Sequence, residues 1–209
     1  MKTDELIRTL AADTLPDPSP ERWLARALPA ALGCVALVLL SAVGIRADLW
    51  EALRAPVTAL KNMVPLGLGG CALWLALRSA RPTQAVRLAW LALFAVGAMA
   101  LFAWGLVSSP MAGWGRGLIG HTAAFCVPVI CLSSALPLGA TLLALRKGAC
   151  LAPLRSGFLA GLASGGLATA IYALHCTEDN PLFFVTWYGL AILLMAGVGA
   201  LCGRWVLRW

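Results

Sequence analysis

The stretch Ile171–Tyr188 contains the densest cluster of reactive side chains in the sequence. An apolar run ends at Leu174, and an imidazole, a thiol and two carboxylates follow at once: His175, Cys176, Glu178 and Asp179. Asn180-Pro181 then favours a turn before a second apolar run begins. Because these groups can ionise, bind a metal ion or change redox state, we take this segment as the first candidate site.

The composition places this segment in a membrane protein. Of the 209 residues, 61% are hydrophobic and only 12% are charged, whereas soluble domains have about 25% charged residues. There are too few polar residues to cover a soluble globule of this length. The net charge of +7 is better explained by basic residues that orient membrane helices than by nucleic-acid binding, so we predict no direct nucleic-acid partner.

Long apolar runs predict six membrane-spanning helices, since a span needs about 20 mainly apolar residues. The predicted spans are Ala27–Ile45, Pro56–Leu77, Leu88–Val107, a segment within Leu118–Leu145, Gly157–Leu174 and Leu182–Leu201. Lys61 weakens the second span, whose start could lie nearer Asn62, and two prolines are expected to kink the fourth. The predicted fold class is therefore all-α, an integral membrane bundle of six transmembrane helices over residues 23–209.

The distribution of basic residues predicts how the bundle is oriented. Twelve of them fall on the side of the two termini, and four fall on the opposite side: Arg46, Arg54, Lys61 and Arg116. Since basic residues favour the cytoplasmic side of a membrane, both termini are expected in the cytoplasm. The loop that carries His175 and Cys176 is then expected to face outward.

Residues 1–22 are predicted to form a separate cytoplasmic segment. A short helix over Met1–Ala12 is followed by the proline-rich linker Leu15–Pro20. Leu6, Ile7 and Leu10 share one face of that helix. Because the helix is too short to be stable alone, we expect it to dock on a partner, with the lipid surface as the alternative.

Glycines at every fourth position mark the fifth predicted span. Gly157, Gly161 and Gly165 form a stripe that allows close helix approach, and Gly199 and Gly203 repeat the pattern in the sixth span. We interpret the stripe as packing within the bundle, with homo-oligomer formation as the alternative.

The predicted topology puts three of the seven cysteines toward the outer side: Cys126, Cys131 and Cys176. Cys126 is the better match to Cys176 in depth. The pair could form a disulfide, or Cys126, Cys176 and His175 could hold a soft metal ion with Glu178 or Asp179 as auxiliary ligands. A third interpretation is that the thiols only pack in the bundle. No obligatory cofactor is predicted.

The sequence has no phosphate-binding loop, nucleophile elbow or paired-histidine zinc motif, so we predict that the protein is not an enzyme. Ionisable residues are scarce in the predicted spans, which disfavours a transport path. A small permease or metal transporter that uses the same thiols is the alternative function. A membrane oxidoreductase would need a quinone site, which the sequence does not reveal.

Several segments carry a resemblance to a known family. They are MKTDELIRTLAAD at the N-terminus, LLALRKGACLAP at Leu142–Pro153, YALHCTEDNP at Tyr172–Pro181, Trp187-Tyr188, and GRWVLRW at Gly203–Trp209. With these segments the sequence resembles the NrsF-type family of six-span membrane anti-sigma factors, negative regulators of an extracytoplasmic-function sigma factor in proteobacteria. The resemblance covers nearly the whole chain.

This resemblance implies that the protein sits in the bacterial inner membrane and holds its sigma factor inactive there. The face of Leu6, Ile7 and Leu10 would then bind the sigma factor. The two characteristic cysteines of the family would fall on Cys126 and Cys176, and the resemblance implies that these thiols sense metal or oxidative stress.

Overall fold

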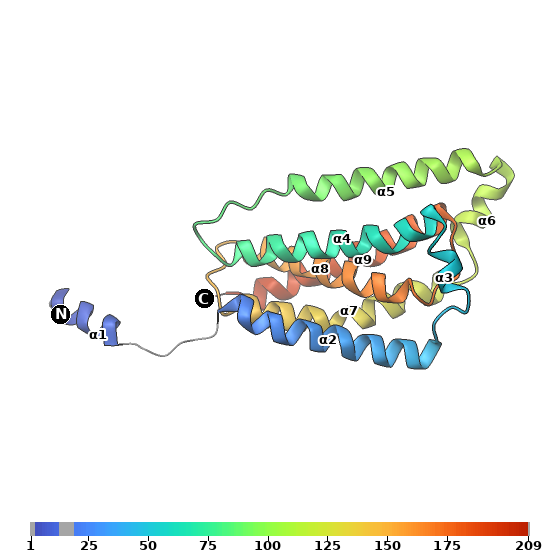
Figure 1. The fold of residues 1–209 in the computed structure, drawn as a ribbon. Coiled ribbons are helices and arrows are strands. Elements are labelled where there is room, and N and C mark those ends of the chain that lie inside the picture. The colour runs from blue at the N-terminus through green and yellow to red at the C-terminus, as the bar shows by residue number, and fades with distance from the viewer. Residues whose placement is uncertain (1–2, 13–18, 209) are drawn as a thin grey trace.

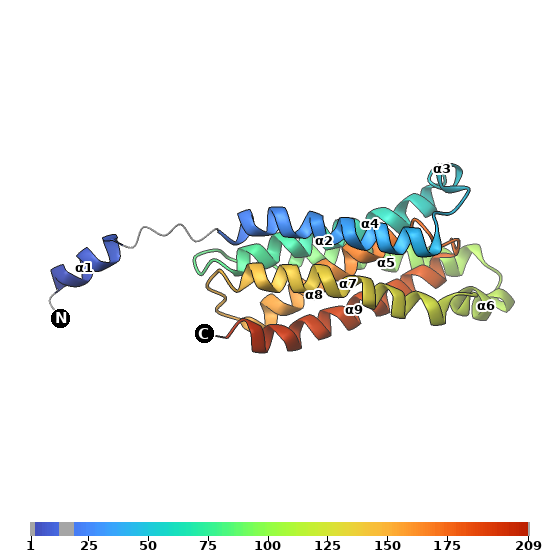
Figure 2. The same ribbon diagram turned by 90° about the horizontal axis from the view of Figure 1, so that it is seen from below.

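The structure, a computed structural model, describes residues 3–12 and 19–208. This part of the chain is helical and contains no strand, which confirms the predicted all-α class. Long helices lie side by side as a bundle, while α1 lies apart from it (Figures 1 and 2). The helices are α1 (Thr3–Ala12), α2 (Pro20–Val43), α3 (Leu49–Ala52), α4 (Pro56–Ser79), α5 (Ala89–Ser108), the 3-10 turn η1 (Met111–Gly113), α6 (Trp114–Ile119), α7 (Ala123–Leu145), α8 (Pro153–Tyr172) and α9 (Pro181–Val206).

Five helices of the described residues are long and apolar enough to cross a membrane: α2, α4, α5, α7 and α9. The remaining long helix, α8, is the most enclosed, because α4, α7 and α9 all pack against it. Its sequence is rich in glycine, alanine and serine, which suits a helix surrounded by other helices rather than by lipid. The membrane character of the chain agrees with the sequence analysis, and the count of six spans stays a prediction.

Proline and a capping residue define the start of two long helices. Ser19 accepts a hydrogen bond from the Arg22 amide at the start of α2. Asn180 accepts one from the Leu182 amide at 2.9 Å, where α9 begins with Pro181. Proline suits a first helical position because the amide hydrogen that it lacks would have no partner there. The predicted break at Asn180-Pro181 coincides with the start of α9, where Asn180 is the capping residue.

The helix bounds add detail to three sequence-based expectations. The helix of the second predicted span, α4, begins at Pro56 as predicted and encloses Lys61, while the point at which it enters the membrane stays a prediction. Within Leu118–Leu145, where the fourth span was predicted, the long helix is α7, and Gly120, with a φ of 56°, separates it from α6. The first long helix starts at Pro20, inside the range assigned to the N-terminal linker, most of which lies outside the described residues.

The glycine stripe packs α8 against α9, as the sequence analysis expected. A Cβ atom added to Gly157 would lie 2.2 Å from the carbonyl oxygen of Gly199. One added to Gly161 would lie 2.2 Å from that of Met195. Only glycine allows the two backbones to approach this closely, so the stripe is used within the bundle.

The bundle has two distinct ends. The thiol end, as we name it, holds the starts of α4, α7 and α9, the ends of α2 and α8, and the loop of residues 173–180. The opposite end holds the start of α2 and the C-terminal end of α9 (Figure 1). The two chain ends thus share one side of the bundle, and the side of the membrane to which they belong stays a prediction.

The close approach of α8 and α9 predicts a site-specific loss of stability. We expect Gly161→Ala to lower the free energy of unfolding by about 1–3 kcal/mol, because overpacking forces the backbones apart. Gly197→Ala, also in a long helix, is the matched control, since nothing lies within 4 Å of its added Cβ. Thermal unfolding in detergent compares the two variants. An equal response to both substitutions would contradict this account of the interface.

Candidate functional site

The two thiols expected to pair lie in one buried cluster at the thiol end. Cys126 lies near the start of α7 and Cys176 in the loop after α8, with side chains 0% and 3% exposed. They share the cluster with Tyr172 and Tyr188. All seven cysteines are free thiols. Cys131 packs at the edge of the same cluster.

The chain turns sharply to bring Cys176 back over the end of α8. The amides of His175 and Cys176 both donate to the carbonyl oxygen of Tyr172, at 2.9 and 3.2 Å. The ring of Tyr172 then packs edge-on against His175 and against Tyr188, with ring centroids 6.0 Å apart in both pairs. Because of this turn, Cys176 packs against the buried tyrosines Tyr172 and Tyr188 and does not lie in an exposed loop.

A buried ammonium group holds the Cys176 backbone in place. Lys61, in α4, is 0% exposed. Its Nζ donates to the carbonyl oxygen of Cys176 at 2.6 Å and to Asp179 Oδ1 at 3.0 Å. Such a group is tolerated only when its charge is paired and hydrogen-bonded, so Asp179 and the Cys176 carbonyl are what allow Lys61 to be buried.

Arg46 adds a second cation to the same loop from the connection after α2. Its guanidinium forms two hydrogen bonds with Asp179, at 2.9 and 3.0 Å, and two with Asp48, both at 2.8 Å. It also donates to the Cys176 carbonyl oxygen at 3.4 Å. Fork-shaped guanidinium–carboxylate pairs of this kind have a fixed geometry. Arg46, Lys61, Asp48 and Asp179 therefore form one ion cluster that fixes the position of Cys176.

The ion cluster shifts the pKa of Asp48 and of Arg46. The hydrogen bonds from Arg46 lower the pKa of Asp48, and those to Asp48 and Asp179 raise the pKa of Arg46. A carboxyl with a lowered pKa stabilises the fold above the usual range near pH 4 and loses that effect as the pH falls. Acidification should therefore loosen this end of the bundle by protonating Asp48.

The remaining candidate side chains of the loop have other partners. His175 Nδ1 lies 3.0 Å from the carbonyl oxygen of Gly44, at the end of α2. Glu178 Oε1 accepts a hydrogen bond from the backbone amide of His121 at 2.9 Å. The same oxygen lies 3.1 Å from the Nδ1 atom of the His121 ring. His121 thus reaches the loop through Glu178, at the exposed rim, and not through the thiols.

These positions bear on the predicted metal site. Among residues 3–12 and 19–208, no three histidine, cysteine, aspartate or glutamate side chains gather closely enough to hold a metal ion. The structure brings Cys126 and Cys176 into one cluster and directs His175, Glu178 and Asp179 to separate partners. A metal held by Cys126, Cys176 and His175 would require rearrangement and stays a prediction.

Sequence reasoning missed four residues of the site: Lys61, Arg46, Tyr172 and Tyr188. Lys61 carried a usable signal, because a lone lysine in an apolar run requires a counter-charge, and the predicted topology put Asp179 at the same end. Arg46 was counted only for its effect on orientation. Both tyrosines lie in segments that carry the family resemblance, Tyr172–Pro181 and Trp187-Tyr188, but neither residue type nor spacing indicates that they contact the thiols.

The N-terminal face is exposed where it is described. Leu6 and Ile7 of α1 have 41% and 57% of their surface accessible. The side chain of Leu10 lies outside the described part of the structure. An apolar face without a covering helix agrees with the expectation of a docking surface, which remains untested.

Comparison with known proteins places these features in a family. The family model described as "Negative regulator of sigma F" matches residues 10–209. The chain is 36% identical over 217 residues to "Anti-sigma-F factor NrsF" of Caulobacter vibrioides, and 32% identical over 213 residues to "Probable anti-sigma-F factor NrsF" of Azospira oryzae. Both alignments cover all of each chain. The chain belongs to the NrsF family. No solved structure matches it.

The match covers the whole of the site in this NrsF-family chain. The thiols, the ion cluster and the tyrosines all lie between residues 10 and 209, whereas Leu6 and Ile7 precede the region that the family model matches. The full-length alignments with the two relatives do include α1. The resemblance inferred from the sequence is confirmed at the level of the family.

The buried ammonium predicts strong coupling between Lys61 and Asp179. Breaking a buried ion pair by removing one partner costs about 3–5 kcal/mol, and we expect Asp179→Asn to fall near the lower limit, because a third of the Asp179 side chain is exposed. Lys61→Met together with Asp179→Asn should cost less than the sum of the single changes.

A double-mutant cycle by thermal unfolding in detergent measures this coupling. The exposed pair of Glu21 and Arg81, with nitrogen and oxygen 2.7 Å apart, is the control, for which we expect a coupling of about 0–1 kcal/mol. Strict additivity at Lys61 and Asp179 would show that the two groups do not stabilise each other.

Proposed function

We propose that this chain is a membrane-bound anti-sigma factor that keeps an extracytoplasmic-function sigma factor inactive. The observation that carries the proposal is membership of the NrsF family over the full chain, together with relatives named as anti-sigma-F factors. The helical bundle with five membrane-capable helices supplies the anchor. In this proposal the protein regulates transcription by sequestration and catalyses no reaction.

The face of Leu6, Ile7 and Leu10 is the proposed contact with the sigma factor. An amphipathic helix that exposes apolar residues can bind by laying that face into an apolar groove of its partner. Two observations support this role: Leu6 and Ile7 are exposed, and α1 lies apart from the bundle (Figure 2). The sigma factor would then provide the apolar surface that the bundle does not.

Cys126 and Cys176 are the proposed sensors of oxidative or metal stress. Their location in one buried cluster supports a pair that acts together. If the thiol end faces the periplasm of the inner membrane, the pair lies in the compartment in which disulfides persist. Both termini would then lie in the cytoplasm with the sigma factor, as the distribution of basic residues predicts.

The ion cluster provides a route by which the sensor can act on the opposite side. Lys61 belongs to α4, Arg46 follows α2, and both donate to the carbonyl oxygen of Cys176. A bond between the two sulfurs would pull on that carbonyl and shift α2 and α4 against α7. Since α2 begins at Pro20, soon after α1, its movement would change how α1 is presented. Such a signal requires a bundle with two packings.

The permease alternative is less well supported. Arg46 and Lys61 are the buried charged side chains among the described residues, and both lie at the thiol end in the ion cluster. A transport path usually carries ionisable groups near the middle of the membrane. The buried charges of this chain are placed to hold one loop.

The sensor assignment predicts a specific regulatory defect. Cys126→Ser or Cys176→Ser should abolish induction by oxidant while repression stays intact, because the proposed partner-binding face lies at the other end. The double variant should match either single variant, since two halves of one site are not additive. A sigma-dependent reporter measures both properties. Cys34→Ser, at an exposed position of α2, is the control. Normal induction in the double variant would return both thiols to a packing role.

The docking assignment predicts loss of repression without loss of the protein. Leu6→Asp together with Leu10→Asp should raise the reporter in the absence of inducer, because two charges replace the proposed apolar contact. Arg8→Gln on the same helix is the control, and immunoblotting of membranes checks that the variants accumulate. Capture of the sigma factor with the intact protein from detergent-solubilised membranes should fail for the double variant only. Full repression by this variant would show that the docking face is elsewhere.

A further inference from the structure

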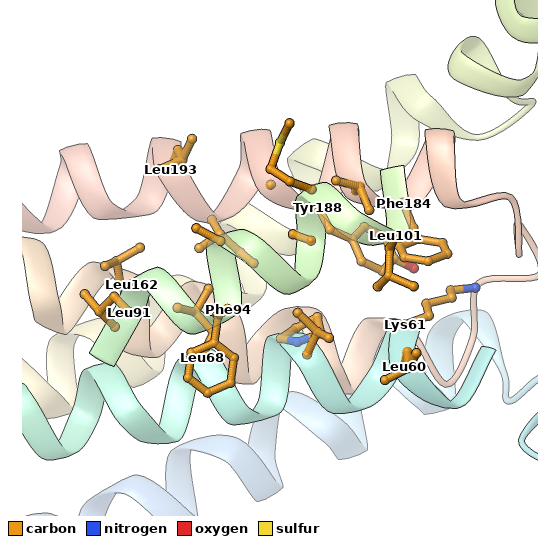
Figure 3. A pocket seen from close by; sticks show the side chains of 18 of the residues that line it. Leu60, Lys61, Leu68, Leu91, Phe94, Leu101, Leu162, Phe184, Tyr188 and Leu193 are labelled. Atoms are coloured by element: carbon orange, nitrogen blue, oxygen red, sulfur yellow. The ribbon is translucent and has the colours of Figure 1, made fainter. Parts of the chain in front are cut away.

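An apolar groove of about 420 Å³ lies between α4, α5, α8 and α9. Figure 3 shows its lining, which includes Leu68, Phe94, Leu162 and Leu193. The helix α5 forms one wall and is otherwise loosely held, since Gly105 is its single buried residue. The groove is thus a long apolar slot in the side of the bundle, as would suit a hydrocarbon chain.

One end of this groove is polar. Lys61 and Tyr188 both line it, and Figure 3 shows them at the same end. The hydroxyl of Tyr188 is buried, and no oxygen or nitrogen atom of the described residues accepts a hydrogen bond from it, although buried polar groups are normally paired with such an atom. Lys61 has three hydrogens to donate and uses two of them on Cys176 and Asp179. Lys61 and Tyr188 thus each keep a hydrogen for which no oxygen or nitrogen acceptor is found among the described residues.

The donors and their surroundings define the chemistry of the ligand. Its head must accept hydrogen bonds and its tail must be apolar. An anionic head is disfavoured, because the Asp179 carboxylate already lies 3.0 Å from Lys61 Nζ and would repel it. Lys61 and Tyr188 lie about 8–10 Å along their helices from Pro56 and Pro181, so the head of a ligand bound to them would lie inside the bundle and not at its end. A neutral carbonyl compound with a long apolar tail meets these requirements.

The groove also borders the thiol pair. Phe184 and Tyr188 line the groove and belong to the buried cluster of Cys126 and Cys176. Neither cysteine lines the groove itself. Tyr188 is thus the polar side chain that belongs both to the groove and to the buried cluster of the thiols. Among neutral carbonyl compounds that dissolve in a membrane, quinones are those that oxidise thiols.

We propose that this groove binds an isoprenoid quinone, with its ring at Lys61 and Tyr188, and that the quinone oxidises Cys126 and Cys176. The inference rests on the proposed sensor function and names its oxidant. Both S–H bonds break and one S–S bond forms. The two electrons and two protons reduce the quinone to a hydroquinone. A rotation of the Tyr188 side chain opens the contact between the ring and the sulfurs.

The test uses the full chain, reduced and reconstituted without oxygen in phospholipid vesicles that contain no quinone. A benzoquinone with a decyl tail and methyl groups at its three other ring positions, which block addition of thiols to the ring, is then added. We expect loss of two of the seven free thiols of each chain and formation of one hydroquinone, which is followed by its absorbance. Tyr188→Phe should slow the reaction about fivefold to tenfold, as expected for one lost hydrogen bond. Leu68→Trp, which fills the groove, should slow it further.

The control is Leu136→Trp, in a separate groove between α2 and α7, which should react at the wild-type rate. The water-soluble oxidant diamide should still close the disulfide in every variant, which shows that the two thiols of each variant can still pair. Photolabelling of the wild-type chain with an azidoquinone should mark α4, α5, α8 or α9, the helices that line the groove.

Three results would overturn the inference. The first is that the quinone leaves the thiols reduced while diamide oxidises them, as expected if phospholipid alone fills the groove. The second is that Leu68→Trp reacts as fast as the wild type. The third is labelling confined to other helices. In each case the thiol sensor itself would stand, whereas failure of diamide to form the disulfide would remove both the sensor and its oxidant.

Discussion

The thiol end of the bundle depends on one buried ammonium group. Lys61 is fully enclosed, and the hydrogen bonds to Asp179 and to the Cys176 carbonyl oxygen compensate its charge. An unpaired ammonium in this position would be strongly destabilising. If the loop of residues 173–180 moved away, Lys61 would stay buried without the carboxylate and the carbonyl oxygen that compensate its charge. Arg46 reinforces the constraint from a second element. The position of Cys176 is thus set by electrostatics rather than by apolar packing alone.

Close backbone packing gives this ion cluster a firm base. The glycines of α8 let α9 approach until a single added methyl group would overlap the facing backbone, and α4 packs against the other side of α8. By contrast, α5 buries little of its surface and leaves a groove beside Tyr188. The bundle therefore combines a rigid centre with a loosely held outer helix at the same level as the thiols. In the proposed function, the rigid part would transmit a change and the loose part would admit the oxidant.

The sequence analysis predicted the architecture well, because helix formation and membrane character depend on composition and local pattern. Long apolar runs marked all of the long helices, the glycine repeat marked the α8–α9 contact, and Asn180-Pro181 marked the start of α9. It did not anticipate two points at which one residue decided the geometry. Gly120 separates α6 from α7 by its positive φ, and Lys61 is accepted inside α4 because a carboxylate from a distant loop reaches it.

By itself, the sequence determined the class of protein, the family resemblance and the choice of Cys126 and Cys176 as a pair. Each of these follows from residue types and their spacing along the chain. The tertiary structure alone decided which groups surround that pair. It placed the tyrosines against the thiols, assigned Asp179 to Lys61 and Arg46, and gave His175 and Glu178 to Gly44 and His121. The physical reason is that hydrogen-bond and ion-pair partners more than 50 residues apart are selected by the packing of helices, which no local pattern records.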